Sequence, residues 1–177
     1  VVAVYKFYYG WGDLLSYFTH GRFLARYVEY DPVGHLPHLL DVLLQLETDI
    51  PMRVDAVGTS TGSMMALGGL VALVTNSTWA GSVLVSTLSA GGQACLWRGM
   101  RTLVPVERQP QAIWAMVVVR AVVFWTSALL KEAIALRGIG MVVLGLARVR
   151  GMRPISGGAL VATGVYATGL VKPYILF

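Results

Sequence analysis

Charged side chains are scarce in this sequence, and it contains a single cysteine. Charged residues make up 13% of the 177 residues, whereas hydrophobic residues make up 56%. One cysteine, Cys95, excludes an internal disulfide framework, and its apolar neighbours favour a buried thiol. A chain of this length and hydrophobicity suits one domain with a substantial core.

The few charges are mostly basic. The 14 Lys and Arg residues outnumber the 9 Asp and Glu residues, which gives a formal net charge of +5. They are dispersed, and the densest group, Arg148, Arg150 and Arg153, has no interleaved aromatic residues. Such a group is more often a solvated loop than a nucleic-acid site, so we expect no nucleic-acid partner.

Histidine is also rare, which limits metal and acid–base chemistry. Two of the 3 histidines, His35 and His38, are close in sequence, but no further ligand follows at a suitable spacing. We therefore expect no metal and no cofactor. His20, His35 and His38 are interpreted as ordinary loop or helix residues, and Asp31 as a turn-capping residue.

The most informative motif is Gly-x-Ser-x-Gly, from Gly58 to Gly62, with Ser60 at its centre. A short apolar run precedes it, and a longer one without proline follows. This layout predicts a tight strand-to-helix turn, in which Gly58 and Gly62 avoid collisions with neighbouring backbone. The turn would present the Ser60 hydroxyl and aim the backbone N–H of Thr61 at an oxyanion beside it.

Apolar patterning elsewhere predicts alternating strands and helices. Strands are expected at residues 1–7, 26–30, 53–57, 82–86 and 173–177, and helices at 14–24, 38–46, 61–74 and 157–170. Residues 96–151 are expected to form two or three helices. Alternation of this kind predicts an α/β fold, with a parallel sheet covered by helices on both faces.

The order and type of these segments resemble the α/β-hydrolase superfamily. The run from Tyr9 to Gly12 occupies the place of that family's His-Gly-x-Gly turn, and Asp31 to His35 matches its Asp-x-x-Gly-His element. The resemblance implies a first part of the core at 1–95, a helical cap-like insertion at 96–151 and a resumed core at 152–177.

By this resemblance, Ser60 would be the nucleophile of a serine hydrolase. Its substrate would be a small apolar molecule with an ester, lactone or amide carbonyl, and the N–H groups of Trp11 and Thr61 would bind the oxyanion. The family's acid and histidine come later in the chain than the resumed strand. We therefore expect the chemistry to be incomplete within these residues, because the sequence given stops at Phe177.

Two other interpretations remain open. Residues 56–97 contain no charge, which is room for two membrane-spanning helices, and Gly58, Gly62, Ala66 and Gly69 would give a close-packing helix face. This pattern is typical of a non-enzymatic, multi-helix membrane protein subunit. The other interpretation is a catalytically dead hydrolase-like scaffold. Self-association is expected if an incomplete sheet leaves an edge exposed.

The first residues lack the basic start and long apolar centre of a signal peptide. A cytoplasmic location is therefore expected if the chain is a hydrolase. A membrane location is the alternative.

Overall fold

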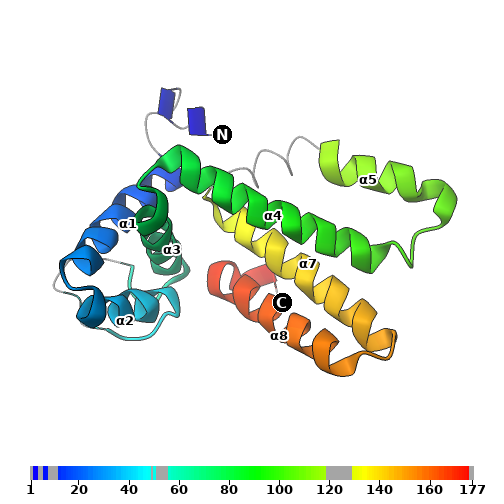
Figure 1. Ribbon diagram of the computed structural model, residues 1–177. Coiled ribbons are helices and arrows are strands. Elements are labelled where there is room, and N and C mark those ends of the chain that lie inside the picture. Colours follow the sequence, from blue (N-terminus) through cyan, green and yellow to red (C-terminus); the bar gives the residue numbers. More distant parts are fainter. Residues whose placement is uncertain are drawn as a thin grey trace. The chain divides into compact units, whose positions relative to one another are not determined.

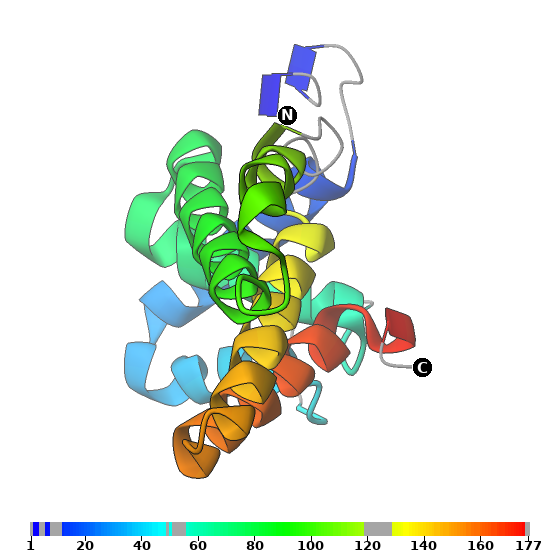
Figure 2. The same cartoon turned by 90° about the vertical axis from the view of Figure 1, so that its right-hand side faces the viewer.

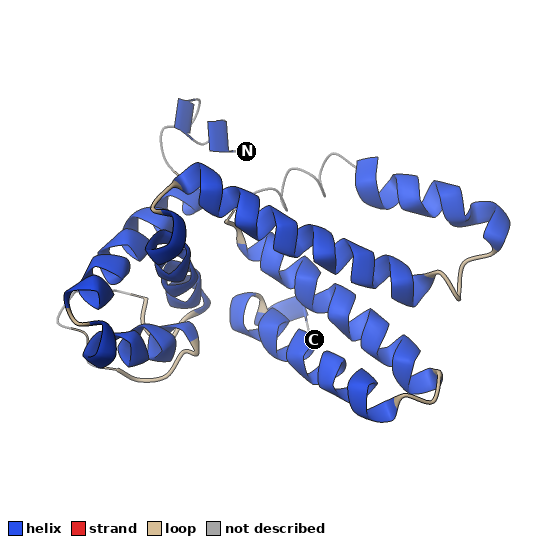
Figure 3. Cartoon of the chain, in the orientation of Figure 1, coloured by secondary structure: helices blue, strands red, loops and turns tan. Residues whose placement is uncertain are grey.

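The chain folds into helices. The computed structural model describes residues 2–3, 6–7, 12–48, 50, 56–118 and 129–175. Figure 3 shows helices and loops throughout this part of the chain, and no strand occurs in it. The expected α/β fold with a parallel sheet is therefore wrong, and so is the resemblance to the α/β-hydrolase superfamily.

The described elements are α-helices and short 3₁₀ segments, labelled in Figure 1. In chain order they are α1 (Asp13–Tyr30), α2 (Pro32–Leu43), α3 (Ser60–Thr75), α4 (Thr78–Met100), η2 (Val106–Arg108), α5 (Gln109–Val118), α7 (Lys131–Arg150), α8 (Pro154–Val171) and η3 (Pro173–Ile175).

Each expected strand is absent from the residues that the structure describes. Residues 26–30 end α1, residues 82–86 lie inside α4, and residues 173–175 form η3. Residues 53–55 lie outside the described part, and residues 56 and 57 are in a turn. Short apolar runs do not distinguish a buried strand from a buried helix, and tertiary packing overrides local β-propensity.

The chain divides into two compact units, which we describe separately. Unit 1 comprises residues 1–84 and 128–131, and unit 2 comprises residues 85–127 and 132–177. The expected division at residues 95 and 151 stays a prediction.

In unit 1, α1 packs on α3 with an ordinary amphipathic pattern. Large apolar side chains of α1, including Leu14, Phe18 and Leu24, are buried. The two helices approach closely at glycines, because a Cβ on Gly21 would lie 2.5 Å from the carbonyl carbon of Gly68. At this distance, neither Gly21 nor Gly68 has room for a side chain larger than a hydrogen atom.

In unit 2, α7 and α8 run antiparallel and meet at two pairs of glycines. A Cβ on Gly164 would lie 2.5 Å from the carbonyl oxygen of Gly138, and one on Gly157 would lie 2.7 Å from that of Gly145. Figures 1 and 2 show the two helices side by side in both views. The helices are thus in close contact at these points, where the side chains of Val142 and Val149 pack beside Gly164 and Gly157.

Glycine also brings α4 against α7. A Cβ on Gly92 would lie 2.5 Å from the Cα of Arg137, and one on Gly99 would lie 2.9 Å from the backbone nitrogen of Leu144. The contacts advance in the same direction along both helices, so this pair is parallel.

One helix, α8, is long and apolar enough to cross a membrane, by length and composition, and 22% of its 18-residue window is buried within the structure. Helices α3 and α4 pass the same test only when taken together, but they are bent by 113° at the break between them. The described part of the chain therefore offers one such helix, or two if the bent pair counts as a single span.

The α7–α8 contact can be tested by adding one methyl group. We expect Gly164→Ala to destabilise the protein by about 1–3 kcal/mol, because its Cβ would press on the Gly138 carbonyl. Gly158→Ala is the matched control, since a Cβ there meets nothing within 4 Å, and it should be neutral or stabilising by up to about 1 kcal/mol. Thermal unfolding followed by circular dichroism measures both, and equal effects would contradict the packing described.

Candidate functional site

Ser60 is the first residue of α3 and follows a tight turn. Residues 56–58 form the turn, and the backbone N–H of Thr59 donates to the carbonyl of Ala56 at 3.2 Å. Gly58 has a φ of 76°, a conformation that side chains other than glycine's rarely adopt. The turn expected around the motif is therefore present, but no strand leads into it within the described residues.

The second glycine and the threonine of the motif close this turn. A Cβ on Gly62 would collide with the carbonyl of Ala56, so only glycine fits there. The Thr59 hydroxyl accepts a hydrogen bond from the N–H of Gly62 at 3.2 Å and donates to the Ala56 carbonyl at 2.7 Å. Thr59 thereby caps α3 and fixes the position of Ser60.

The residue that touches Ser60 was not expected from the sequence. Lys131, the first residue of α7, donates from Nζ to Ser60 Oγ at 2.9 Å and to Thr61 Oγ1 at 3.1 Å. The same ammonium group lies 6.0 Å from the centre of the Tyr17 ring. All four residues belong to unit 1, so a cation, two hydroxyls and an aromatic ring form one cluster, which we call the Lys131 cluster.

The backbone N–H groups of Trp11 and Thr61 are the two oxyanion donors expected from the sequence. Trp11 lies outside the described residues. Thr61 is in the first turn of α3, where backbone N–H groups have no acceptor within the helix, so its N–H is in the kind of position that can bind a negative charge. The Thr61 hydroxyl, however, accepts a hydrogen bond from Lys131 Nζ.

The histidines have other partners. The His35 ring stacks on Tyr27 with ring centres 3.7 Å apart, and His38 Nδ1 lies 3.0 Å from the Tyr27 hydroxyl. His20 Nδ1 lies 2.9 Å from the Ser16 carbonyl within α1. Two of the three rings thus join α1 to α2. Those two, His35 and His38, lie in α2.

Asp31 caps α2, as predicted, by accepting a hydrogen bond from the N–H of Gly34 at 3.1 Å. No group of three or more His, Cys, Asp or Glu side chains suited to a metal ion occurs in the described part of the chain.

Comparison with protein-family models, with curated proteins and with solved structures finds no match. The lack of a sheet among the described residues removes the basis for the hydrolase resemblance. The Lys131 cluster must therefore be interpreted from its own geometry. A lysine whose amine contacts two hydroxyls and lies near an aromatic ring can stabilise the start of α3, and it also places an amine beside the Ser60 hydroxyl.

The cap on α3 gives a direct test of how the turn is held. Thr59→Ala should destabilise the protein by about 1 kcal/mol, because the N–H of Gly62 loses its acceptor. Thr59→Ser keeps a hydroxyl at the cap, so its stability should stay within about 0.5 kcal/mol of the original. Both are measured by thermal unfolding, and an equal loss for the two variants would show that the hydroxyl is not what stabilises this helix start.

Proposed function

We propose that this chain is a helical membrane protein and serves as a non-enzymatic, multi-helix subunit of a membrane assembly. The proposal depends chiefly on the side chains that α8 buries and exposes. The buried residues of this helix are Gly157, Gly164, Thr168 and Val171. Several of its large apolar side chains are exposed, whereas Val171 is the one large apolar residue among those buried.

Outward-facing apolar residues on α8 are the central observation. Ile155 is 90% exposed, Tyr166 54% and Val165 39%. A helix in water normally buries its large apolar side chains and exposes its polar ones. In hydrocarbon the requirement is reversed, because small residues on the inner face let helices approach while large apolar residues contact lipid. The pattern of α8 matches the second case.

Helix α7 supports the same proposal. The residues that it buries are all alanine or glycine, namely Ala133, Ala135, Gly138, Gly140 and Gly145. Contacts at glycine exclude little apolar area from water but allow close van der Waals packing. Dispersion and close packing are what drive helix association in lipid.

The fold and the charge pattern add two further arguments. The charge-free residues 56–97 lie almost entirely in α3 and α4, since only residues 56–59 and 76–77 are outside these helices. Helices satisfy every backbone polar group internally, which hydrocarbon demands of any segment that crosses it. This is the arrangement that a membrane interpretation of these residues requires.

The contact between Lys131 and Ser60 favours a second candidate, a serine hydrolase that acts on a small apolar carbonyl substrate without an α/β-hydrolase fold. Nζ of Lys131 lies 2.9 Å from Ser60 Oγ, within reach for proton transfer. Serine–lysine pairs are a convergent variant of serine–histidine chemistry. To act as the base, the Lys131 amine would accept the proton of the Ser60 hydroxyl, which reverses the direction of this hydrogen bond.

Membrane insertion is tested by alkaline carbonate extraction of cells that express the chain. We expect the chain to stay in the membrane pellet and to need detergent for release. Val165→Lys should raise the extracted fraction, because a lysine at the middle of a spanning helix costs about 3 kcal/mol. Ser156→Lys, in the first turn of the same helix, should leave it unchanged. A chain that stays soluble and monodisperse without detergent would overturn the proposal.

The second candidate is tested by labelling with a fluorophosphonate that reacts with activated serines. If it is correct, Ser60→Ala abolishes labelling, and Lys131→Met slows it by at least about 100-fold, the usual contribution of a general base. Ser156→Ala serves as the control, because that serine is exposed on α8. Labelling of the original chain no faster than that of Ser60→Ala would eliminate the hydrolase and leave the non-enzymatic proposal.

A further inference from the structure

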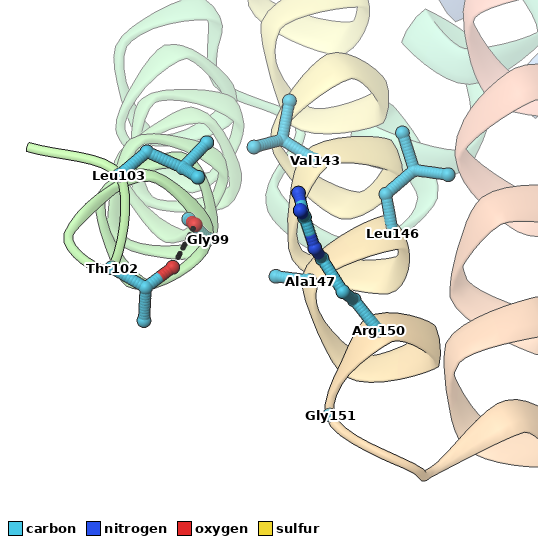
Figure 4. Close-up of a pocket in the computed structure, with 8 residues that line it drawn as sticks. All are labelled: Gly99, Thr102, Leu103, Val143, Leu146, Ala147, Arg150 and Gly151. Carbon is cyan, nitrogen blue, oxygen red and sulfur yellow. Dashed lines mark hydrogen bonds between the residues drawn. The ribbon is translucent and has the colours of Figure 1, made fainter.

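A groove of about 610 Å³ lies in unit 2 between the end of α4 and the end of α7. Its walls are mostly apolar and come from Leu103, Val143, Leu146 and Ala147, with Arg150 also lining it. Figure 4 shows the Arg150 side chain extending back along α7, past Ala147 and toward Val143. The guanidinium group therefore lies along the groove and does not point away from it.

The apolar walls of this groove are open. Leu103 is 69% exposed and Leu146 is 57% exposed. Both side chains therefore offer apolar surface to an occupant of the groove. A hydrocarbon chain would cover these surfaces and contact Val143 between them. An occupant with an apolar part therefore fits the groove better than a wholly polar one.

Arg150 adds a charge requirement. The ion pair recorded in the described part of the chain joins Lys172 and Glu132, and none is recorded there for Arg150. A guanidinium group binds phosphate through two parallel hydrogen bonds, in a geometry that lysine cannot reproduce. The occupant should therefore carry an anionic group with phosphate-like geometry beside its apolar part.

The surroundings of the groove have the same sign of charge. Arginines cluster where α4 and α7 end and α8 begins: Arg98, Arg101, Arg108, Arg148, Arg150 and Arg153. Glu107 is the one acidic residue among residues 98–118 and 143–157. At the other end of α7 and α8, Lys172 donates to Glu132 at 2.6 Å, and this hydrogen bond raises the pKa of the lysine. Among the described residues of unit 2, basic residues therefore outnumber acidic ones mainly at the end that holds the groove, and Arg137 on α7 is the exception.

We propose that this groove binds an anionic phospholipid, with its phosphate on Arg150 and an acyl chain along Leu103, Val143 and Leu146. The inference rests on the proposed membrane function. Membrane proteins keep excess Lys and Arg on the cytoplasmic side, and that leaflet carries anionic lipids. The basic end of unit 2 then faces the cytoplasm, where this lipid is present.

The test is native mass spectrometry of the full chain in detergent, titrated with phosphatidylglycerol or with phosphatidylcholine of identical acyl chains. We expect phosphatidylglycerol to be retained in preference. Arg150→Gln should lower its bound fraction at least about fivefold, as expected for the loss of one bidentate charged contact. Arg153→Gln removes the same charge from the same end without lining the groove, and it should change binding by less than about twofold.

A larger side chain in the groove tests whether its apolar walls contribute to lipid binding. Ala147→Phe keeps every charge and should also lower phosphatidylglycerol binding. If that variant does not fold, Leu103→Gln replaces an exposed groove residue and should have the same effect. Equal losses for Arg150→Gln and Arg153→Gln, equal binding of the two lipids, or binding that survives a filled groove would each overturn the proposal. If a second copy of the chain occupied the groove instead, native mass spectrometry would show a dimer without bound lipid, and that result would also overturn the proposal.

The two proposals fail in different ways. A chain that resists carbonate extraction but shows no preference for phosphatidylglycerol refutes the lipid site alone. A chain that is soluble without detergent refutes the membrane function and the lipid site with it.

Discussion

Backbone contact at glycine is the constraint on which the helix pairs depend. Gly138 and Gly145 on α7 face Gly164 and Gly157 on α8, with the same seven-residue spacing on both helices. Any side chain at these positions would push the helices apart, so the inner faces must stay small. Several large apolar residues of the two helices, among them Leu146, Val149, Ile155 and Tyr166, are then exposed. The close packing and the apolar outer surface are thus two results of one pattern, and hydrocarbon is the solvent that suits both.

Charge is distributed in a way that the packing alone does not require. Glycine contacts would form equally well if the arginines were spread along the helices, yet most of the described arginines of unit 2 lie where α4 and α7 end. Of the described arginines outside this end, Arg137 lies on α7 and its backbone contacts Gly92 on α4. A protein in water gains little from such segregation. A helix bundle across a membrane gains a defined orientation, because moving one charged end through hydrocarbon is costly.

Much of the helical structure was predictable, but the fold class was not. Helices expected at 61–74 and 157–170 correspond to α3 and α8, because their apolar runs are long and lack internal proline. The strand expected at 82–86 is the instructive error. Its Val-Leu-Val core has strong β-propensity, but it lies inside a 23-residue helix, and a five-residue run cannot reveal that context. The seven-residue spacing of Gly92 and Gly99, later in the same helix, was a helical signal that could have corrected it.

The site shows a sharper limit of sequence reasoning. The glycines of the Gly58–Gly62 motif do shape a tight turn before a helix, as expected, but that geometry needs only the Ala56 carbonyl and no sheet. Lys131 is 71 residues from Ser60 in the chain, and nothing in the spacing links them. Once found, the contact has a sufficient structural explanation. An ammonium group in an apolar segment is costly unless it is paired, and two hydroxyls with the Tyr17 ring supply partners without any chemistry at Ser60. This is why the pairing of Ser60 with a base favours a hydrolase less strongly here than it would beside a histidine and a carboxylate.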